Sequence, residues 1–198
     1  MSTAIFGGTF DPVHNGHIKI AHSAIEQFKL SKLVIVPNAN PPHKKNEVST
    51  DFTHRFNMLK LAIEDVDKVE ISDCEAGEGK YHYSLNTMRY FRELYGEDTY
   101  FILGADSLCT IHLWYEYEKF LRENRFIVFV RENDVELMKC FEEYKSRGVE
   151  LHLADMPFYD GSSSKVRESF KLGKNPVDML ARKVSVYIMQ TGLYGGRP

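Results

Sequence analysis

Features that define several common classes of protein are missing from this sequence. It has three cysteines, Cys74, Cys109 and Cys140, and no C-x-x-C pair, so nothing supports a structural zinc site. Because the cysteine count is odd and no signal peptide is recognised, we expect a reducing, cytoplasmic location. No apolar run reaches the ~18 residues of a membrane-spanning helix, so we expect no membrane partner.

An excess of charge of one sign is also missing. The formal net charge is −3, and no basic stripe with interleaved aromatic residues occurs, so we expect no nucleic-acid partner. The phosphate-binding fingerprints G-x-G-x-x-G and G-x-x-x-x-G-K-[ST] are absent as well. This composition favours a local site for a small anionic ligand.

What is present is a regular alternation of apolar strands and amphipathic helices in a chain that is 43% hydrophobic. The predicted strands are residues 4–6, 33–37, 69–72, 100–103, 126–130 and 150–153. The predicted helices are residues 17–29, 52–65, 84–95, 115–122, 135–147, 164–172 and 184–189. Repeated strand–helix units predict an α/β fold with a Rossmann-like, doubly wound parallel sheet. We expect a single domain over residues 1–198, with a small C-terminal helical part from about residue 161.

Several polar or small residues follow predicted strands directly: Gly7-Gly8, Asn38, Gly104 and Arg131. Ligands of doubly wound sheets bind beyond the carboxyl ends of the strands, where the strand order reverses. We therefore expect these residues to lie on one rim of the sheet and to form the binding site.

The stretch TAIFGGTFDPVHNGHIKIAH (residues 3–22) is the most informative part of the chain. A strand runs into Gly7-Gly8, and His14 and His17 follow where a helix should begin. Glycines let the backbone approach an anion, and a helix N-terminus offers free N–H groups. Imidazoles add donors whose charge can change near neutral pH. The stretch predicts a phosphate site; a metal site would need a third ligand, which no nearby motif supplies.

Two segments carry a resemblance to a known superfamily. GGTFDPVHNGH resembles the nucleotide-binding signature of the HxGH nucleotidyltransferases, which transfer a nucleotidyl group from ATP or CTP to a phosphate and release pyrophosphate. GSSSKVR (residues 161–167) resembles their second signature, ISSTxIR, with Gly161 in place of the usual isoleucine and Ser164 in place of the threonine. By itself this second segment is also compatible with an ordinary capped helix and a surface arginine.

Further stretches resemble the bacterial nicotinate mononucleotide adenylyltransferases within this superfamily. They are PNANPPHK (residues 37–44), YSLNT (83–87), GAD (104–106) followed by Trp114, and the closing segment 184–194. The resemblance spans residues 3 to 194 in order. It implies a sheet of the nucleotidyltransferase type and transfer of adenylyl from ATP to nicotinate mononucleotide, giving deamido-NAD and pyrophosphate in NAD biosynthesis. The other acceptors left open are nicotinamide mononucleotide and a pantetheine phosphate, and a non-catalytic nucleotide sensor is the alternative of a different class.

The resemblance also implies roles for individual residues. The residues implied to bind ATP are Gly7, Gly8, Thr9, His14, His17, Asp106, Ser163 and Arg167, with His17 and His14 as the catalytic pair. Those implied to bind the mononucleotide are Asn38, His43, Lys44, Thr87, Trp114, Tyr115 and Arg131. Trp114 would stack on the pyridine ring, and backbone N–H groups near Thr87 and Tyr115 would bind the nicotinate carboxylate.

These assignments have ordinary alternatives. Trp114 could instead be core or interface, Asp106 a helix cap, and the charges at 44 and 131 solvated surface. Arg55, on a predicted helix, is assigned no contact. Mg²⁺ is expected to accompany ATP with few protein ligands, and no residue is assigned to it. The sequence leaves open whether the chain forms a homo-oligomer.

Overall fold

The computed structural model of the chain describes residues 2–39, 50–76, 83–130, 135–155 and 159–197. The predicted site residues His43, Lys44 and Arg131 lie outside these ranges, so their assignments are not addressed by the structure.

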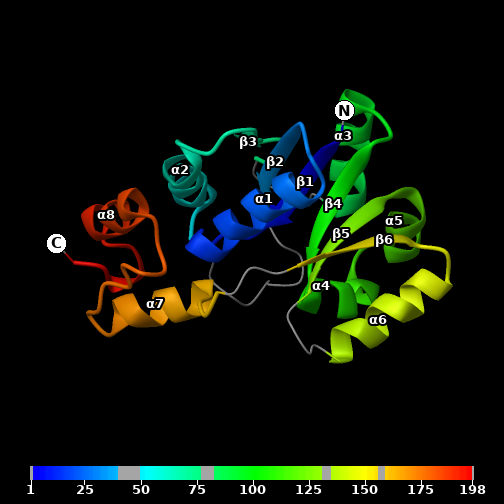
Figure 1. The fold of residues 1–198 in the computed structure, drawn as a ribbon. Coiled ribbons are helices and arrows are strands. Elements are labelled where there is room, and N and C mark those ends of the chain that lie inside the picture. Colours follow the sequence, from blue (N-terminus) through cyan, green and yellow to red (C-terminus); the bar gives the residue numbers. More distant parts are fainter. Residues whose placement is uncertain (1, 40–49, 77–82, 131–134, 156–158, 198) are drawn as a thin grey trace.

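A six-stranded parallel sheet forms the centre of the molecule (Figure 1). Its strands are β1 (Thr3–Gly8), β2 (Lys32–Pro37), β3 (Val69–Ile71), β4 (Thr99–Gly104), β5 (Arg125–Val130) and β6 (Glu150–Asp155). They lie in the order β3-β2-β1-β4-β5-β6. This order reverses direction between β1 and β4, so it is the doubly wound arrangement predicted from the sequence. The rim at the carboxyl ends of β1 and β4 is therefore the expected ligand site.

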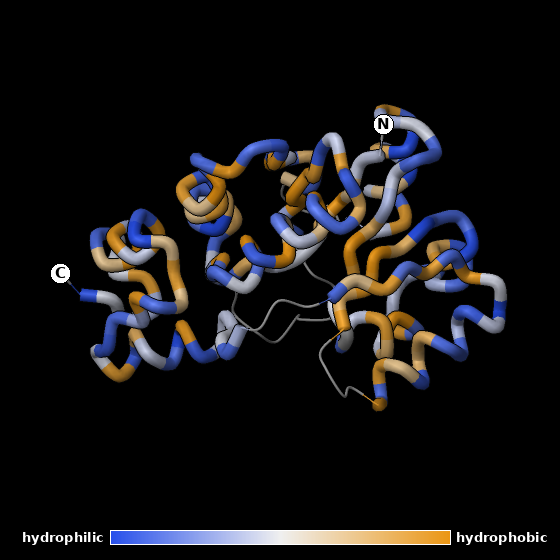
Figure 2. The backbone as a smooth tube through the Cα atoms, viewed as in Figure 1, coloured by the Kyte–Doolittle hydropathy of each residue, from blue (hydrophilic) through white to orange (hydrophobic). Residues whose placement is uncertain are grey.

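Helices cover both faces of the sheet (Figure 1). Their bounds are α1 (Asn15–Gln27), α2 (Phe52–Ile63), α3 (Ser84–Tyr95), α4 (Ala105–Cys109), η2 (Ile111–Leu113), α5 (Tyr117–Glu123), α6 (Val135–Ser146), α7 (Ser163–Lys171), α8 (Arg182–Thr191) and η3 (Leu193–Gly195). One core cluster joins the sheet to α1, α2, α7 and α8; the other joins it to α3, α4, α5 and α6. Figure 2 shows hydrophobic strands through the centre and helices with mixed hydropathy around them.

The C-terminal helices α7 and α8 lie at one end of the molecule, with α8 beside α2 (Figure 1). Their buried residues Val166, Phe170, Val184 and Ile188 belong to the same core cluster as β1 and β2. This shared core attaches the C-terminal part to the sheet instead of leaving it as a separate lobe.

The segment between β4 and β5 contains the predicted helix, but the helix starts later than predicted and two short helices precede it. A helix over residues 115–122 was predicted, but α5 begins at Tyr117 and is preceded by the short α4 and η2. Trp114 has an extended backbone (φ −82°, ψ 151°) and Glu116 a left-handed one (φ 48°). These two conformations separate η2 from α5 and set the start of the helix at Tyr117.

Two of the three cysteines are bonded to each other. Cys109 at the end of α4 and Cys140 on α6 form a disulfide with a Cα–Cα distance of 5.5 Å, whereas Cys74 is a free, half-buried thiol. The cysteine count and spacing gave no sign of this pair, because they cannot show which residues the fold brings together. Among the described residues, no helix has the length and apolar character that crossing a membrane requires.

Candidate functional site

The two histidines lie at the start of α1 and contact each other. His14 is the N-cap residue, with an extended backbone, and its N–H donates to Nδ1 of His17 at 3.1 Å. Their rings stack with centroids 3.7 Å apart. Because Nδ1 of His17 accepts a hydrogen bond, the ring proton of the neutral residue lies on Nε2. His17 is therefore set up to donate through Nε2.

Both imidazoles are neutral at pH 7. Burial lowers the pKa of His14 to about 4, and burial together with the neighbouring His14 lowers the pKa of His17 well below its usual value. The sequence suggested donors that change charge near neutral pH; in the free protein they are neutral donors. Within the described ranges no group of three His, Cys, Asp or Glu residues could hold a metal ion.

The second signature segment, at the start of α7, contacts the loop before α1. Ser163 Oγ donates to the carbonyl oxygen of Pro12 at 2.9 Å, and Arg167 Nη1 donates to that of Asp11 at 2.6 Å. Tyr194, from η3, donates its hydroxyl to Asp11 Oδ1 at 2.5 Å. Burial, and then this bond, raise the pKa of Tyr194, so it remains a donor. Two segments about 150 residues apart thus form one site beside the histidines.

Arg55, to which the sequence assigned no contact, supports the loops on both sides of the site. Its side chain is only 1% exposed. It donates to the backbone carbonyls of Thr9 (2.7 Å), Thr50 (2.8 Å) and Ala39 (3.4 Å). One signal was available: Arg55 lies on the same helical face as the buried Met58 and Leu59. An arginine on that face must find acceptors inside the protein.

The residues at the ends of the neighbouring strands lie on the same rim. Gly7 and Gly8 are the last residues of β1, and the N–H of Asn38, just after β2, donates to the Gly8 carbonyl at 2.8 Å. Asp106 is an exposed residue in the first turn of α4, whose N-cap is Gly104. Asp106 is thus not the cap of this helix, and its carboxylate faces solvent at the rim.

The structure brings the two segments predicted to bind the nicotinate group together. Tyr83, the N-cap of α3, stacks on Tyr115 with ring centroids 4.0 Å apart. The Thr87 N–H donates to the Tyr83 carbonyl at 3.1 Å, so it is not free for a ligand. The N–H groups of Ser84 and Leu85, in the first turn, have no partner among the described residues. The N–H groups without a partner among the described residues therefore lie one turn before Thr87.

Thr87 itself binds a buried acid that sequence reasoning missed. Its Oγ1 donates to Glu75 Oε1 at 2.6 Å, and Glu75 is only 4% exposed. Burial raises the pKa of Glu75 to about 7, opposed by the bonds from Thr87 and from the Ala39 backbone. Glu75 thus connects α3 to the segment after β2. No sequence signal set it apart from the acidic residues around it.

Trp114 is partly buried against the core cluster on the α3 side of the sheet. Its ring packs beside Phe120 (centroids 5.7 Å apart) and edge-on to Phe101 (6.3 Å). Tyr115 is 48% exposed, and its N–H has no partner in the described part of the chain. Trp114 thus packs against the core, and its stacking on the pyridine ring stays a prediction.

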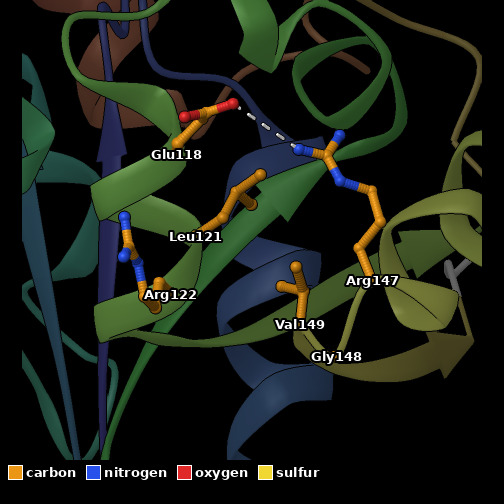
Figure 3. Close-up of a pocket in the computed structure, with 6 residues that line it drawn as sticks. All are labelled: Glu118, Leu121, Arg122, Arg147, Gly148 and Val149. Carbon is orange, nitrogen blue, oxygen red and sulfur yellow. Dashed lines mark ion pairs between the residues drawn. The ribbon is translucent and has the colours of Figure 1, made fainter.

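A separate pocket of about 380 Å³ lies between α5 and the turn that precedes β6 (Figure 3). Its lining residues are Glu118, Leu121, Arg122, Arg147, Gly148 and Val149. These residues precede the strands β5 and β6, so the pocket is at the opposite edge of the sheet from the histidines. It contains none of the predicted site residues.

The strand order, the rim position and the histidine pair at a helix start together define a nucleotide-binding α/β protein of the nucleotidyltransferase type. Comparison with known proteins agrees. Residues 5–169 match the family model described as cytidylyltransferase-like. A protein of Clostridium tetani named "Probable nicotinate-nucleotide adenylyltransferase" is 40% identical over 96% of this chain and 98% of its own length. A protein of the same name from Caldicellulosiruptor bescii is 37% identical over 98% and 99%.

Solved structures have the same fold. The nicotinic acid mononucleotide adenylyltransferase of Plasmodium falciparum complexed with NaAD has a TM-score of 0.81 at 23% identity, covering 99% of this chain and 98% of the other. The same protein complexed with APC has a TM-score of 0.79. The chain belongs to the cytidylyltransferase-like family, among the nicotinate-nucleotide adenylyltransferases.

Proposed function

We propose that this chain transfers the adenylyl group of ATP to nicotinate mononucleotide, giving deamido-NAD and pyrophosphate. The observation that carries the proposal is the presence of two donor sets on one rim. One set is the histidine pair at the start of α1; the other consists of the N–H groups at the start of α3 and at Tyr115 that have no partner within the described ranges. The first suits a phosphate and the second a carboxylate.

At the donor end, catalysis is electrostatic. The attacking group is a phosphate oxygen of the mononucleotide, already ionised at pH 7, so no general base is needed. It attacks the α-phosphorus, the bond to the β-phosphate breaks, and pyrophosphate leaves. His17 Nε2–H donates to an α-phosphate oxygen as charge builds, and His14 fixes the His17 ring. The backbone of Gly7, Gly8 and Thr9 approaches the nucleotide, and Asp106 faces its ribose.

The leaving pyrophosphate is assigned to the start of α7. Ser163 and Arg167 lie beside the loop that leads to His14, and both currently donate to carbonyls of that loop. An incoming polyphosphate would compete for these donors, because a charged acceptor binds a guanidinium more strongly than a carbonyl does. Arg167 thus both positions the loop and can turn to the product.

At the acceptor end, the proposed selectivity follows from the N–H groups that have no partner in the described part of the chain. A nicotinate carboxylate accepts from all of them, whereas the NH₂ of a nicotinamide would face donors with no acceptor. Trp114 supplies a ring face for the pyridine, and Asn38 and Thr87 line the same end. His43, Lys44 and Arg131 are proposed, from the family resemblance alone, to bind the mononucleotide phosphate.

Mg²⁺ is proposed to enter with ATP and to neutralise phosphate charge. Of the carboxylates near the site, Asp11 accepts from the Tyr194 hydroxyl and from the Thr50 N–H, whereas Asp106 is exposed. This suits an ion whose ligands are mainly phosphate oxygens and water. We also propose a cytoplasmic location, where ATP is plentiful.

The test is pyrophosphate release from ATP in the presence of nicotinate mononucleotide, nicotinamide mononucleotide or a pantetheine phosphate. We expect release with the first at a much higher kcat/KM than with the others. Release only with another acceptor would reassign the substrate. No release with any acceptor, despite ATP binding, would make the chain a nucleotide sensor.

A further inference from the structure

The ring of Tyr159 covers the histidine pair from the side of α7. Tyr159 stacks on His14 with centroids 5.2 Å apart and an interplanar angle of 16°. His14 stacks in turn on His17, and Phe10 lies edge-on to His17 at 4.9 Å. Four rings thus form a continuous column, with the two histidines in the middle.

Two glycines make room for this ring. A Cβ on Gly16 would lie 2.5 Å from Cδ1 of Tyr159, and a Cβ on Gly161 would overlap its ring and hydroxyl. Gly161 stands where the ISSTxIR signature has isoleucine, so this departure from the signature and the placement of Tyr159 are sterically linked. An aromatic ring occupies the space that a side chain at position 161 would take.

Ring contacts on both faces hold His14 in the column. Its Nδ1 is buried and has no hydrogen-bond partner among the described residues. Tyr159 is itself anchored, because its hydroxyl donates to the Met179 carbonyl at 3.1 Å. The charged groups nearby are Lys19, 5.7 Å from the Tyr159 ring centre, and Asp160, which pairs with Lys165.

We propose that Tyr159 is a positioning residue for adenylyl transfer: its ring, admitted by Gly161, holds His14 against His17 and keeps water from the pair. The proposal rests on the proposed function, in which His17 donates to the α-phosphate. Without the ring, the His14 imidazole loses one of the two rings that enclose it, and its stack on His17 loses support.

Y159A and Y159F test the role of the ring. In Y159A we expect kcat to fall roughly 3- to 10-fold with little change in the KM for ATP, the scale of one aromatic stacking contact. The pKa of His14, about 4 in the parent, should rise toward 6.5 as water reaches it, as read by NMR titration. Y159F keeps the ring, so its His14 pKa should remain low and its kcat should fall far less.

Y90A is the matched control, because Tyr90 is 51% exposed on α3 and outside the column. It should leave both kcat and the His14 pKa unchanged. A Y159A protein that loses only thermal stability, with kcat and the His14 pKa as in the parent, would overturn the proposal.

G161I provides a second test that does not depend on Y159A alone. Isoleucine at 161 must displace the Tyr159 ring, so G161I should lower kcat and raise the His14 pKa as Y159A does. The double variant Y159A/G161I should then have a kcat only slightly below that of either single variant. If the two changes lowered kcat independently, so that their effects added in full, Gly161 would not act by making room for the Tyr159 ring. A parent protein that releases no pyrophosphate would refute the proposed function alone, since the His14 titration needs no substrate.

Discussion

Replacing His17 separates the hydrogen bond that its ring accepts in the structure from the one that we propose it donates to substrate. Nδ1 accepts from the His14 N–H, which leaves Nε2–H as the donor to substrate. In H17N the asparagine can place an oxygen where Nδ1 of His17 lies, but no group where Nε2 lies. In H17Q the glutamine can place an NH₂ where Nε2 lies, but no acceptor where Nδ1 lies. H17N should therefore lose the donor that acts on the developing charge, and H17Q should keep much of it.

The expected loss follows from one donor to a transition-state oxyanion. Removing such a donor costs roughly 10²–10³ in kcat, about 2.7–4 kcal/mol. The kcat of H17N and of H17A should fall by that factor. The kcat of H17Q should fall by about tenfold or less, because H17Q loses only the hydrogen bond from the His14 backbone. The assay is pyrophosphate release at saturating ATP and nicotinate mononucleotide.

Two results would refute this reasoning. One is a near-normal kcat in H17N. The other is a parent kcat that rises as the pH falls through about 6.5, because that would require an imidazolium, whereas Nδ1 of His17 accepts a hydrogen bond and its pKa is well below the usual value.

Four further predictions follow from the site. Trp114→Ala should raise the KM for the mononucleotide roughly tenfold or more and leave the KM for ATP nearly unchanged, with W114F as the control that keeps a ring; an effect on ATP alone would contradict stacking on the pyridine. Glu75 has a pKa of about 7, above its usual 4.5, so the folded state binds the extra proton and the parent should lose up to about 3 kcal/mol of stability as pH rises from 4.5 to 7. In E75Q the free energy of unfolding, measured by urea denaturation, should not fall with pH in this way. An equal fall in the two proteins would show that Glu75 is not the group responsible. Arg55→Met should lower the free energy of unfolding by about 3–5 kcal/mol, because three carbonyls lose a buried donor; a change below about 1 kcal/mol in urea denaturation would show that those bonds contribute little. Under denaturing conditions without reductant a thiol assay should find one free cysteine, and after reduction three, whereas three from the outset would mean that Cys109 and Cys140 are not bonded.

The sequence predicted the sheet because its strands are short apolar runs that alternate with amphipathic helices. Helix α3 was placed at Ser84–Tyr95, where Gly96 takes a left-handed φ of 88° and ends the helix. The helices α4 and η2 were missed because five and three residues are too few to show a helical period. The Gly7-Gly8 turn and the His14/His17 pair could be recognised because all four residues lie within one short stretch of the chain.

The contacts that hold the site together were beyond sequence reasoning because they join distant segments. Asp11 meets Arg167 and Tyr194 only after the C-terminal helices pack on the sheet. The same holds for Cys109 and Cys140, whose spacing gives no sign of their proximity. Thr87 was assigned to the mononucleotide from a motif, and that role stays a prediction. Its N–H bonds the Tyr83 carbonyl, and the nearby N–H groups without a partner among the described residues are those of Ser84 and Leu85.

The central claim is that nicotinate mononucleotide attacks the α-phosphorus of ATP, and following the label of [α-³²P]ATP tests it most directly. The account predicts that all transferred label appears in deamido-NAD, with one unlabelled pyrophosphate released per dinucleotide formed. Label in AMP or ADP, or pyrophosphate released without a labelled dinucleotide, would contradict it.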